Sequence, residues 1–426
     1  MPMHMSTILL AGVALLGLVA PVRAVPSETQ LGVAQLVEVA TEVNPQVRAA
    51  RARWYSAVHQ IKPNYAPADP LLGYANVDSA TNGFSQASLH AMTISQSFQF
   101  PGKALLQADN AARLAQIAHL NLEAVVRNVR ASTETAYYQL LLDDSVAQVQ
   151  ADIVQDLGQV AKVAEVAYSA NQVTQTDFIS SEFDFAAAQQ NQLQSHTAAL
   201  NDMTALNQLM FRPPDEPLGI DRRLELKPLA IPLDKLTAMA ANIRQEILEA
   251  ALAQHHARTA LELARLEYAP DYTIGYTFDN YLLSSAAPSP NGRMQDHGFS
   301  FSFNLPAFFW IKQSEDVKRA SFDLEAARFD LDSVRSQTAA TVTTLYRSAQ
   351  LAYQTALLYR DTLIPLARQD FEVGLTAYQS GKIDFTTLVS TLQRSYNARL
   401  AYLQASNQFL ASRVALEQAV GEPLEH

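Results

Sequence analysis

The 426-residue sequence contains 42 acidic and 31 basic residues, so its formal net charge is −11, and it has no cysteine. The missing cysteines exclude disulfide bonds, thiolate metal sites and a lipid-anchored N-terminal cysteine. The acidic balance, without a basic patch that contains aromatic residues, argues against nucleic acid as a partner.

The first 24 residues are typical of a signal peptide. An apolar run from Ile8 to Ala20 is too short to span a bilayer as a helix, and Val22-Arg23-Ala24 is a small-residue cleavage pattern. The usual positive charge is missing from residues 1–7, which leaves a buried N-terminal helix as the alternative. We predict a signal peptide at 1–24 and an exported, acidic protein.

The rest of the chain contains one pattern twice. The paired residues occur in the same order at offsets between 202 and 210, and they include Tyr65-Ala66-Pro67 with Tyr268-Ala269-Pro270, Gly73-Tyr74 with Gly275-Tyr276, Phe98 and Pro101 with Phe303 and Pro306, and Ala167-Tyr168 with Ala377-Tyr378. Small loop insertions account for the drift in the offset. We therefore expect two structural repeats, 25–220 and 221–426.

Each repeat is predicted to begin with helices and to continue with two strands. In the first repeat the helical pattern of residues 31–64 breaks at Asn44-Pro45, where Asn caps and Pro opens a second helix. Alternating residues then predict strands at about 72–79 and 87–100, and at about 271–280 and 296–305 in the second repeat. The loops within the two pairs fall at about 78–86 and 282–296.

The predicted strands are aromatic or aliphatic on one side and small or hydroxylic on the other. In 299–305, for example, Phe299, Phe301 and Phe303 alternate with serines. The pattern fits an ordinary sheet with one face on a core, but it also fits a lipid-facing band around a polar lumen. We favour lipid, because no other apolar element is available to cover the aromatic face. Since four strands are too few to close a barrel, several chains must contribute to one barrel.

The longest elements follow the strands. Residues 103–169 contain no proline and one glycine, which predicts a nearly continuous helix on the order of 100 Å long. The corresponding helix of the second repeat runs over about 312–378, and we expect Pro365 and Gly374 to bend it. Return helices at 176–209 and 384–420 complete two hairpins, 103–209 and 312–420. A fibrous coiled coil would explain these helices but not the strands.

The tips of the two hairpins have related sequences. Tyr168 to Asn171 corresponds to Tyr378 to Gly381, and Asn and Gly are the residues that tolerate a left-handed turn best. Asp384 is placed to cap the helix that follows the second tip. At the other end of the hairpins, Pro101, Gly102 and Pro306 mark the corners between strands and helices.

These tips, together with Gln393-Arg394-Ser395-Tyr396-Asn397-Ala398, resemble the outer-membrane efflux proteins of the TolC family over nearly the whole mature chain. The corner Phe98-Gln99-Phe100-Pro101-Gly102-Lys103 is further similar to the CzcC-like branch, which is associated with heavy-metal cations. The resemblance implies an α+β membrane protein with a long helical tunnel in the periplasm and a twelve-stranded barrel in outer-membrane lipid, made by a homotrimer. It also implies a periplasmic membrane-fusion adaptor and an inner-membrane pump, of the RND type, as partners.

The family often carries acidic rings after the second tip, and the corresponding positions here are Thr387 and Ser390. The equivalent position of the first tip, Asp177, is acidic. We consider a closed-state latch between Asp177 and Lys382. The alternative is that Asp384 only caps a helix and that Lys382 is a solvated turn residue.

No arrangement of residues suggests catalysis or a cofactor. The histidines are scattered, His255 and His256 are adjacent and so point to different sides of a helix, and no pair has zinc spacing. We therefore predict a non-enzymatic outer-membrane duct without a cofactor or metal, for heavy-metal cations, drugs or a type I secretion substrate. The alternative is a periplasmic structural coiled coil or adaptor without a barrel.

Overall fold

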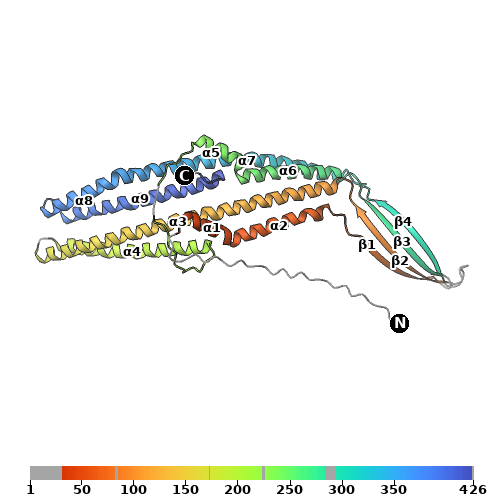
Figure 1. Ribbon diagram of the computed structural model, residues 1–426, viewed down its shortest axis with the longest axis horizontal. Coiled ribbons are helices and arrows are strands. Elements are labelled where there is room, and N and C mark those ends of the chain that lie inside the picture. Colours follow the sequence, from red (N-terminus) through yellow and green to blue (C-terminus); the bar gives the residue numbers. More distant parts are fainter. Residues whose placement is uncertain (1–30, 82–84, 172, 223–225, 284–292, 425–426) are drawn as a thin grey trace.

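The computed structural model describes residues 31–81, 85–171, 173–222, 226–283 and 293–424. The chain is elongated, with a sheet at one end and the tips of two helical hairpins at the other (Figure 1). The predicted signal peptide at 1–24 lies outside the described residues, as do parts of both predicted strand loops.

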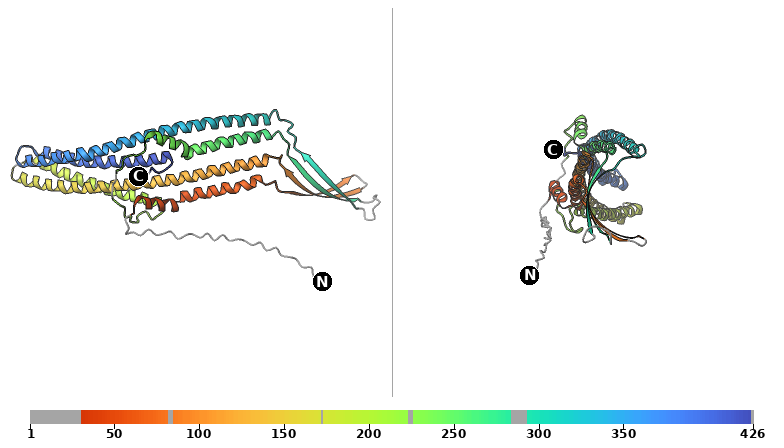
Figure 2. Two further views of the ribbon diagram at one scale, coloured as in Figure 1. Left: turned by 45° about the horizontal axis from the view of Figure 1, so that its top comes forward. Right: turned by 90° about the vertical axis from the view of Figure 1, so that its right-hand side faces the viewer.

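Two sets of elements follow one another in the same order. The first set consists of α1 (Val33–Val43), α2 (Pro45–Tyr65), β1 (Leu71–Thr81), β2 (Ser85–Phe98), α3 (Lys103–Ser169) and α4 (Gln175–Leu209). The second set consists of α5 (Leu233–Ile243), α6 (Gln245–Leu266), β3 (Tyr272–Leu283), β4 (Arg293–Phe303), α7 (Gln313–Leu358), the π-helical turn η1 (Tyr359–Leu363), α8 (Ile364–Gln379) and α9 (Phe385–Val420). The helices run side by side along the long axis, and the strands continue from their ends (Figure 2).

The break between α1 and α2 lies at Asn44 and Pro45, as the sequence predicts. Asn44 Oδ1 accepts a hydrogen bond from Gln46 N at 2.8 Å, and Pro45 occupies the first turn of α2. The cap satisfies a donor that the helix leaves unpaired. Asn44 Nδ2 also donates to Leu209 O at 3.1 Å, so the same side chain fixes the end of α4.

The long helix of the second set is interrupted just before Pro365. Proline has no N–H, and its ring displaces the carbonyl group one turn earlier, so the ladder of hydrogen bonds widens locally. The π-helical turn η1 at Tyr359–Leu363 is this widening, and α8 begins directly after it. Gly374 has another role than the predicted bend, because it lies buried inside α8, where an added Cβ would be 3.1 Å from Thr391 Oγ1.

The four strands form one antiparallel sheet in the order β1-β2-β3-β4. Both predicted pairs are confirmed, and the pairing of β2 with β3 joins the two sets. In this register Ile94 is opposite Tyr276, which in turn is opposite Phe299. Directly opposed side chains share a face, so most of the large apolar residues nearest the helices, from Leu72 and Ile94 to Tyr276 and Phe301, gather on one side of the sheet.

This aromatic face has no cover within the described chain. Phe299 is 86% exposed and Phe301 is 64% exposed, and the sheet extends beyond the ends of the helices (Figure 1; Figure 2, left). The other face carries Thr93, Ser95, Thr277, Ser300 and similar small residues. The interpretation of an ordinary sheet with one face on the chain's own core is therefore wrong.

Apolar packing holds the helices together in each set. Leu36 and Ala40 of α1 are fully buried with Leu206 and Val129, and Leu236 and Ala240 of α5 are fully buried in the same way with Val342 and Leu416. Burial of one such leucine stabilises the fold by about 1.5–3 kcal/mol. Leu36 and Leu236, like Ala40 and Ala240, are 200 positions apart, so the repeat extends into the helical core.

Candidate functional site

The two hairpin tips have the predicted turn geometry. Asn171 has φ of 56° and Gly381 has φ of 69°, so both occupy the left-handed region. At the first tip, Tyr168 stacks on Phe178 with ring centroids 5.6 Å apart. At the second, Tyr378 meets Phe385 edge-on at 6.2 Å.

Two acidic side chains at the tips are used as helix caps. Thr174 and Asp177 form a capping box, in which Asp177 N donates to Thr174 Oγ1 at 3.2 Å and Asp177 Oδ2 accepts from Thr174 N at 3.1 Å. Asp384 Oδ1 accepts from Thr387 N at 2.8 Å, which confirms the predicted cap, and these hydrogen bonds lower the pKa of Asp384.

Asp177 also faces the second hairpin. Burial raises the pKa of Tyr378, and the negative charge of Asp177 raises it further, so these two side chains of different hairpins lie close together. No ion pair joins Asp177 to Lys382 among the residues that the structure describes. The latch between them therefore stays a prediction.

The predicted gate positions after the second tip carry exposed hydroxyl groups. Ser390 Oγ donates to Thr387 O at 2.7 Å, so this hydroxyl group bonds within its own helix. Lys382 is exposed in the turn. The role of Thr387 and Ser390 in gating stays a prediction as well.

A second group of side chains joins the two hairpins farther from the tips. The hydroxyl of Tyr396 on α9 donates a hydrogen bond to Asp156 Oδ2 on α3, and Arg399 Nη2 donates to Asp152 Oδ2 at 3.0 Å. Burial, and then the bond to Asp156, raise the pKa of Tyr396. We call these four residues the cross-hairpin cluster. They line a groove of about 870 Å³ between α3, α8 and α9.

Tyr396 belongs to the segment that resembles the TolC family, but the sequence by itself indicates no role for it. One signal was available: Asp152 and Asp156 are four residues apart on one face of a predicted helix, and Tyr396 and Arg399 are three apart on another. Which helix faces them was not visible, because the pairing spans 240 residues.

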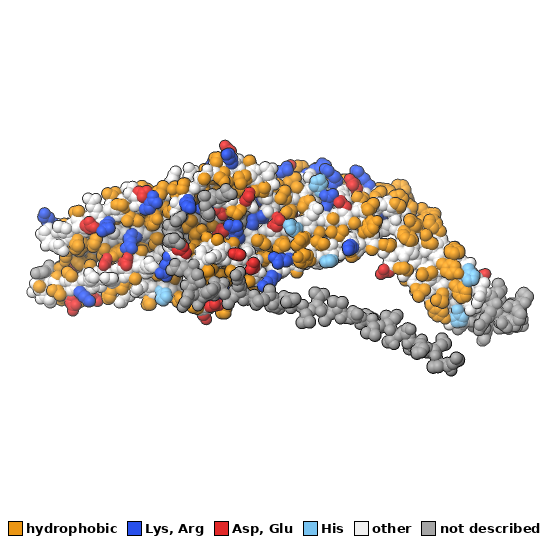
Figure 3. Space-filling view, viewed as in Figure 1, with side chains coloured by type: hydrophobic (Ala, Val, Ile, Leu, Met, Phe, Trp, Pro, Cys, Tyr) orange, Lys and Arg blue, Asp and Glu red, His pale blue; other side chains and the backbone are white. Residues whose placement is uncertain are grey.

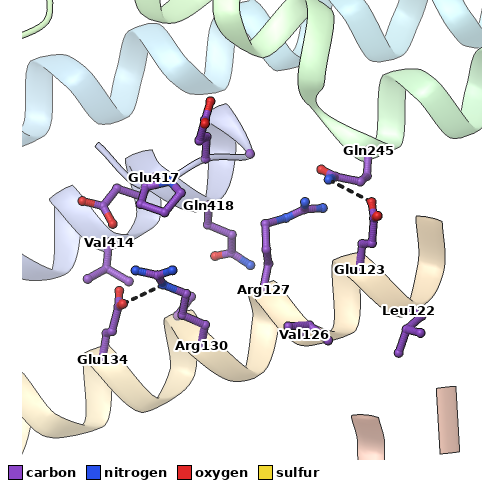
Figure 4. A pocket seen from close by; sticks show the side chains of 14 residues that line it. Leu122, Glu123, Val126, Arg127, Arg130, Glu134, Gln245, Val414, Glu417 and Gln418 are labelled. Carbon is purple, nitrogen blue, oxygen red and sulfur yellow. Dashed lines mark hydrogen bonds and ion pairs between the residues drawn. The ribbon is translucent and has the colours of Figure 1, made fainter. Parts of the chain in front are cut away.

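A pocket of about 430 Å³ lies where the end of α9 and the start of α6 both meet α3 (Figure 4). Arg130 Nε donates to Glu134 at 2.9 Å, and Gln245 Nε2 donates to Glu123 at 3.4 Å. Burial lowers the pKa of Arg127, which points into the pocket, and burial raises the pKa of Glu417 at its wall. The hydrogen bond between Gln245 and Glu123 joins the two sets at this pocket, and the described lining offers no nucleophile with a base beside it.

At the corners between sheet and helices, a buried lysine joins the two sets. Gly102 has φ of 102°, which lets the chain turn from β2 into α3. Lys103 is 2% exposed, and its Nζ donates to Ala269 O at 3.0 Å and to Asp271 Oδ1 at 2.9 Å. Asp271 Oδ1 also accepts from Phe100 N at 2.7 Å. This network ties the corner at Pro101 and Gly102 to the loop before β3.

The described part of the chain holds no group of three or more His, Cys, Asp and Glu side chains suited to a metal ion. Within the same residues, no helix combines the length and the hydropathy that crossing a membrane requires.

One protein-family model matches the second set of elements. The family model described as outer membrane efflux protein matches residues 236–422, from α5 to the residue after α9. This half of the chain is similar to the outer membrane efflux proteins. A search of the curated proteins finds no match.

Solved structures show the same fold over most of the chain. The CmeC outer membrane channel of Campylobacter jejuni superposes with a TM-score of 0.78 at 14% identity, covering 92% of this chain and 86% of that one. VceC, an outer membrane protein of Vibrio cholerae, gives 0.76 at 16% identity, covering 92% and 97%. The open MtrE outer membrane channel of Neisseria gonorrhoeae gives 0.73 at 17% identity, covering 92% and 89%.

These findings confirm the predicted TolC-like fold, in which long helical hairpins continue from four antiparallel strands. The similarity of residues 236–422 to outer membrane efflux proteins also agrees with the predicted location in the outer membrane, extending into the periplasm, and with a transport role in place of an enzymatic one.

Proposed function

We propose that this chain is one protomer of a homotrimeric outer-membrane channel that serves a tripartite efflux system. Three sheets join into a twelve-stranded barrel in the outer membrane, and the helices of the three chains enclose a tunnel in the periplasm. The hairpin tips dock on a membrane-fusion adaptor, which an inner-membrane pump of the RND type supplies with substrate. The channel is passive, and the pump provides the energy.

The main support for this proposal is the sheet. Within the described residues β1 and β4 are its two edge strands, so each has a row of backbone N–H and C=O groups without a partner strand. Such edges are not tolerated next to lipid, and four strands are too few to close on themselves. Pairing of β1 with β4 of a neighbouring copy removes every edge at once.

The faces of the sheet agree with the same arrangement. The exposed aromatic side chains, such as Phe299 at 86%, suit lipid, while the threonines and serines opposite them suit a water-filled lumen. A structural coiled coil without a barrel would leave this apolar face in water, which is the observation that disfavours it.

An introduced pair of cysteines tests the trimer directly, because the natural chain has none. We would combine Ala75→Cys on β1 with cysteine at Gly298, Ser300 or Ser302 on β4. One of the three pairs is expected to link neighbouring chains and to give a covalent trimer from outer-membrane extracts. The control pair Thr93→Cys with Thr277→Cys joins directly opposed residues of one chain and is expected to leave the chain monomeric on a denaturing gel. A soluble periplasmic monomer would contradict the proposal.

For the substrate we propose heavy-metal cations, on the similarity of the corner at Pro101-Gly102-Lys103 to the CzcC-like branch. Drug efflux and type I secretion are the other candidates. Deleting the gene and comparing growth on metal salts with growth on drugs separates them. Sensitivity to drugs alone would exclude the metal assignment.

A further inference from the structure

The corner between β4 and α7 is longer than its counterpart in the first repeat. Four residues (99–102) separate β2 from α3, whereas nine residues (304–312), which we call the aromatic corner, separate β4 from α7. Both corners contain the proline that the repeats share, Pro101 and Pro306. Because the first corner turns the chain from strand to helix without the five additional residues, these residues serve something other than the turn.

The aromatic corner carries a cluster of large, exposed apolar side chains. Phe308, Trp310 and Ile311 keep 67%, 58% and 63% of their surface exposed, and Phe309 keeps 48%. The ring of Phe309 lies 5.2 Å from that of Trp310 and 6.2 Å from that of Tyr268, just after α6, so the side chains form one group. Contiguous exposed apolar groups of this kind mark sites of contact with another molecule.

The aromatic corner continues the side of the sheet that the proposed channel turns toward lipid. Asn304 N donates to Asp271 O at 2.9 Å, so the pairing of β3 with β4 continues for one residue beyond Phe303. The alternation that places Phe303 on the aromatic face then places Leu305, which is 65% exposed, on the same side. Figure 3 shows hydrophobic side chains gathered at the junction between the sheet and the helices. The apolar surface therefore extends past the strands to the corner.

The backbone of the aromatic corner suits the edge of an apolar layer. Phe308 O accepts a hydrogen bond from Ile311 N at 2.9 Å. Ser314 serves the next two carbonyl groups, because its N–H donates to Phe309 O at 2.9 Å and its hydroxyl group donates to Trp310 O at 2.7 Å. Three consecutive carbonyl groups are therefore satisfied within the chain, which lowers the cost of moving them out of water.

Charged residues begin directly after the apolar run. Lys312 is exposed, and in the first turns of α7 Glu315 pairs with Lys318 at 2.8 Å and Asp316 with Arg319 at 3.3 Å. The two carboxylates are thus balanced by cations of the same helix, and Lys312 adds a positive charge next to the corner. An apolar run that contains tryptophan and ends in charged residues is typical of a segment at the boundary between lipid and water.

We infer that the aromatic corner lies in the periplasmic leaflet of the outer membrane, with its apolar side chains among the acyl chains just below the headgroups. The inference rests on the outer-membrane channel proposed above, which places α6 and α7 on the periplasmic side. Trp310 suits this depth, because its ring is apolar while its indole N–H donates to headgroups or water. Lys312 lies at the level of the lipid phosphate groups, and a trimer places three such corners around the barrel.

Tryptophan fluorescence tests the inference, because Trp54 and Trp310 are the two tryptophans of the chain. The variant Trp54→Phe leaves Trp310 as the reporter. The variant Trp310→Phe leaves Trp54, which lies 11 residues before the end of α2, about 16 Å along the helix, and is the control. Both trimers are reconstituted in vesicles of phosphatidylcholine that carries bromine on its acyl chains, either near the headgroups or near the bilayer centre.

We expect bromine near the headgroups to quench most of the Trp310 emission, and bromine near the bilayer centre to quench less of it. Iodide added to the water should quench Trp310 little, and neither brominated lipid should quench Trp54. Quenching of Trp310 by iodide but not by brominated lipid would show that the corner lies in water. Quenching by neither would show that a neighbouring copy covers it. Either result overturns the inference.

The apolar side chains are tested in the Trp54→Phe background. Phe308→Ser/Ile311→Ser is expected to lower the ratio of lipid quenching to iodide quenching about tenfold, since the burial of two large apolar side chains is lost. Val163→Ser/Val166→Ser, which removes two similarly exposed apolar residues of α3 near the first tip, is the matched control and should leave the ratio unchanged. The same ratio in both double variants would also overturn the inference. Chains that remain monomeric in these vesicles would instead contradict the channel itself.

Discussion

The hydroxyl group of Tyr396 is one of the groups that join the two hairpins beyond their tips. Tyr396 on α9 donates to Asp156 on α3, and the neighbouring pair of Arg399 and Asp152 is half exposed. Exposed ion pairs contribute under about 1 kcal/mol, whereas a hydrogen bond to a charged group contributes about 1.5–3 kcal/mol. Tyr396 is therefore the residue of the cross-hairpin cluster on which the contact between α3 and α9 depends most.

We expect Tyr396→Phe to shift the tips toward a more open state and to raise the mean ion conductance of the reconstituted channel several-fold, since a loss of about 1.4 kcal/mol changes a population ratio tenfold. The matched control is Tyr402→Phe, a tyrosine of α9 that lines the same groove. Unchanged conductance in Tyr396→Phe would remove the cluster from the gate.

At the scale of residues, the sequence predicts turns and caps, which form between residues that are close together in the chain. Asn171 and Gly381 were predicted to turn the tips, because a positive φ limits the choice of residue, and Asp384 was predicted to cap α9, because a cap bonds within three residues. The bond between Tyr396 and Asp156 was not predicted. It joins helices whose relative rotation depends on the packing of the whole bundle.

At the scale of elements, α3 and α4 enclose a carboxyl group that prefers to be neutral. Burial and a hydrogen bond with Asp143 raise the pKa of Asp202 from 3.8 to about 7. Because the pKa is raised on folding, the folded chain binds more protons than the unfolded chain between these values. The hairpin therefore loses stability as the pH rises from 3.8 to about 7, and the penalty is complete above that range.

We expect Asp202→Asn to stabilise α3 and α4 against local unfolding by about 1 kcal/mol at pH 8 and to change their stability little at pH 5. The figure is reduced because Asp202 is only partly buried. Hydrogen exchange over residues 139–145 and 198–206 measures it. Glu182→Gln, an exposed position of α4, is the control. A variant that is equally protected at both pH values relative to the wild type would contradict the raised pKa.

The contact between α8 and α9 depends on the size of one side chain. An added Cβ at Gly374 would be 3.1 Å from Thr391 Oγ1 and 3.4 Å from its Cγ2, so Gly374→Ala pushes the helices apart. We expect a cost of about 1–3 kcal/mol from overpacking, against a gain of about 1 kcal/mol in helix propensity. In the Thr391→Ala background only the gain remains, so the sign reverses. Hydrogen exchange of α8 measures both, and equal effects in both backgrounds would refute the clash.

Elements were predicted well where their pattern is periodic. The alternation in 299–305 gave β4, and the absence of proline in 103–169 gave α3. The pairing of β2 with β3 was not predicted, because residues about 180 positions apart give no local signal of their register. The role of Gly374 was misjudged for the same reason, since only the packed helices reveal that Thr391 lies above it.

At the scale of the whole molecule, the sheet and the helices meet at corners that must hold a fixed angle. Lys103 belongs to the first repeat, and the groups that it contacts, Ala269 O and Asp271, belong to the loop before β3 in the second. Its ammonium group is almost fully buried, while the carboxylates around it, Asp271 and Glu267, keep 39% and 47% of their side chains exposed. One cation therefore joins the two repeats where the proposed barrel continues into the tunnel.

We expect Lys103→Met to weaken this junction, since removing one partner of a buried pair costs about 3–5 kcal/mol and the exposure of Asp271 reduces that figure. The trimer should then dissociate at a lower temperature on denaturing gels after heating. Adding Asp271→Asn should restore part of the loss, because the uncompensated charge disappears while the amide oxygen still accepts from Phe100 N. Lys318→Met, which removes an exposed lysine of α7, controls for charge and should leave the dissociation temperature unchanged. If Lys103→Met also leaves the dissociation temperature unchanged, the strands alone hold the corner.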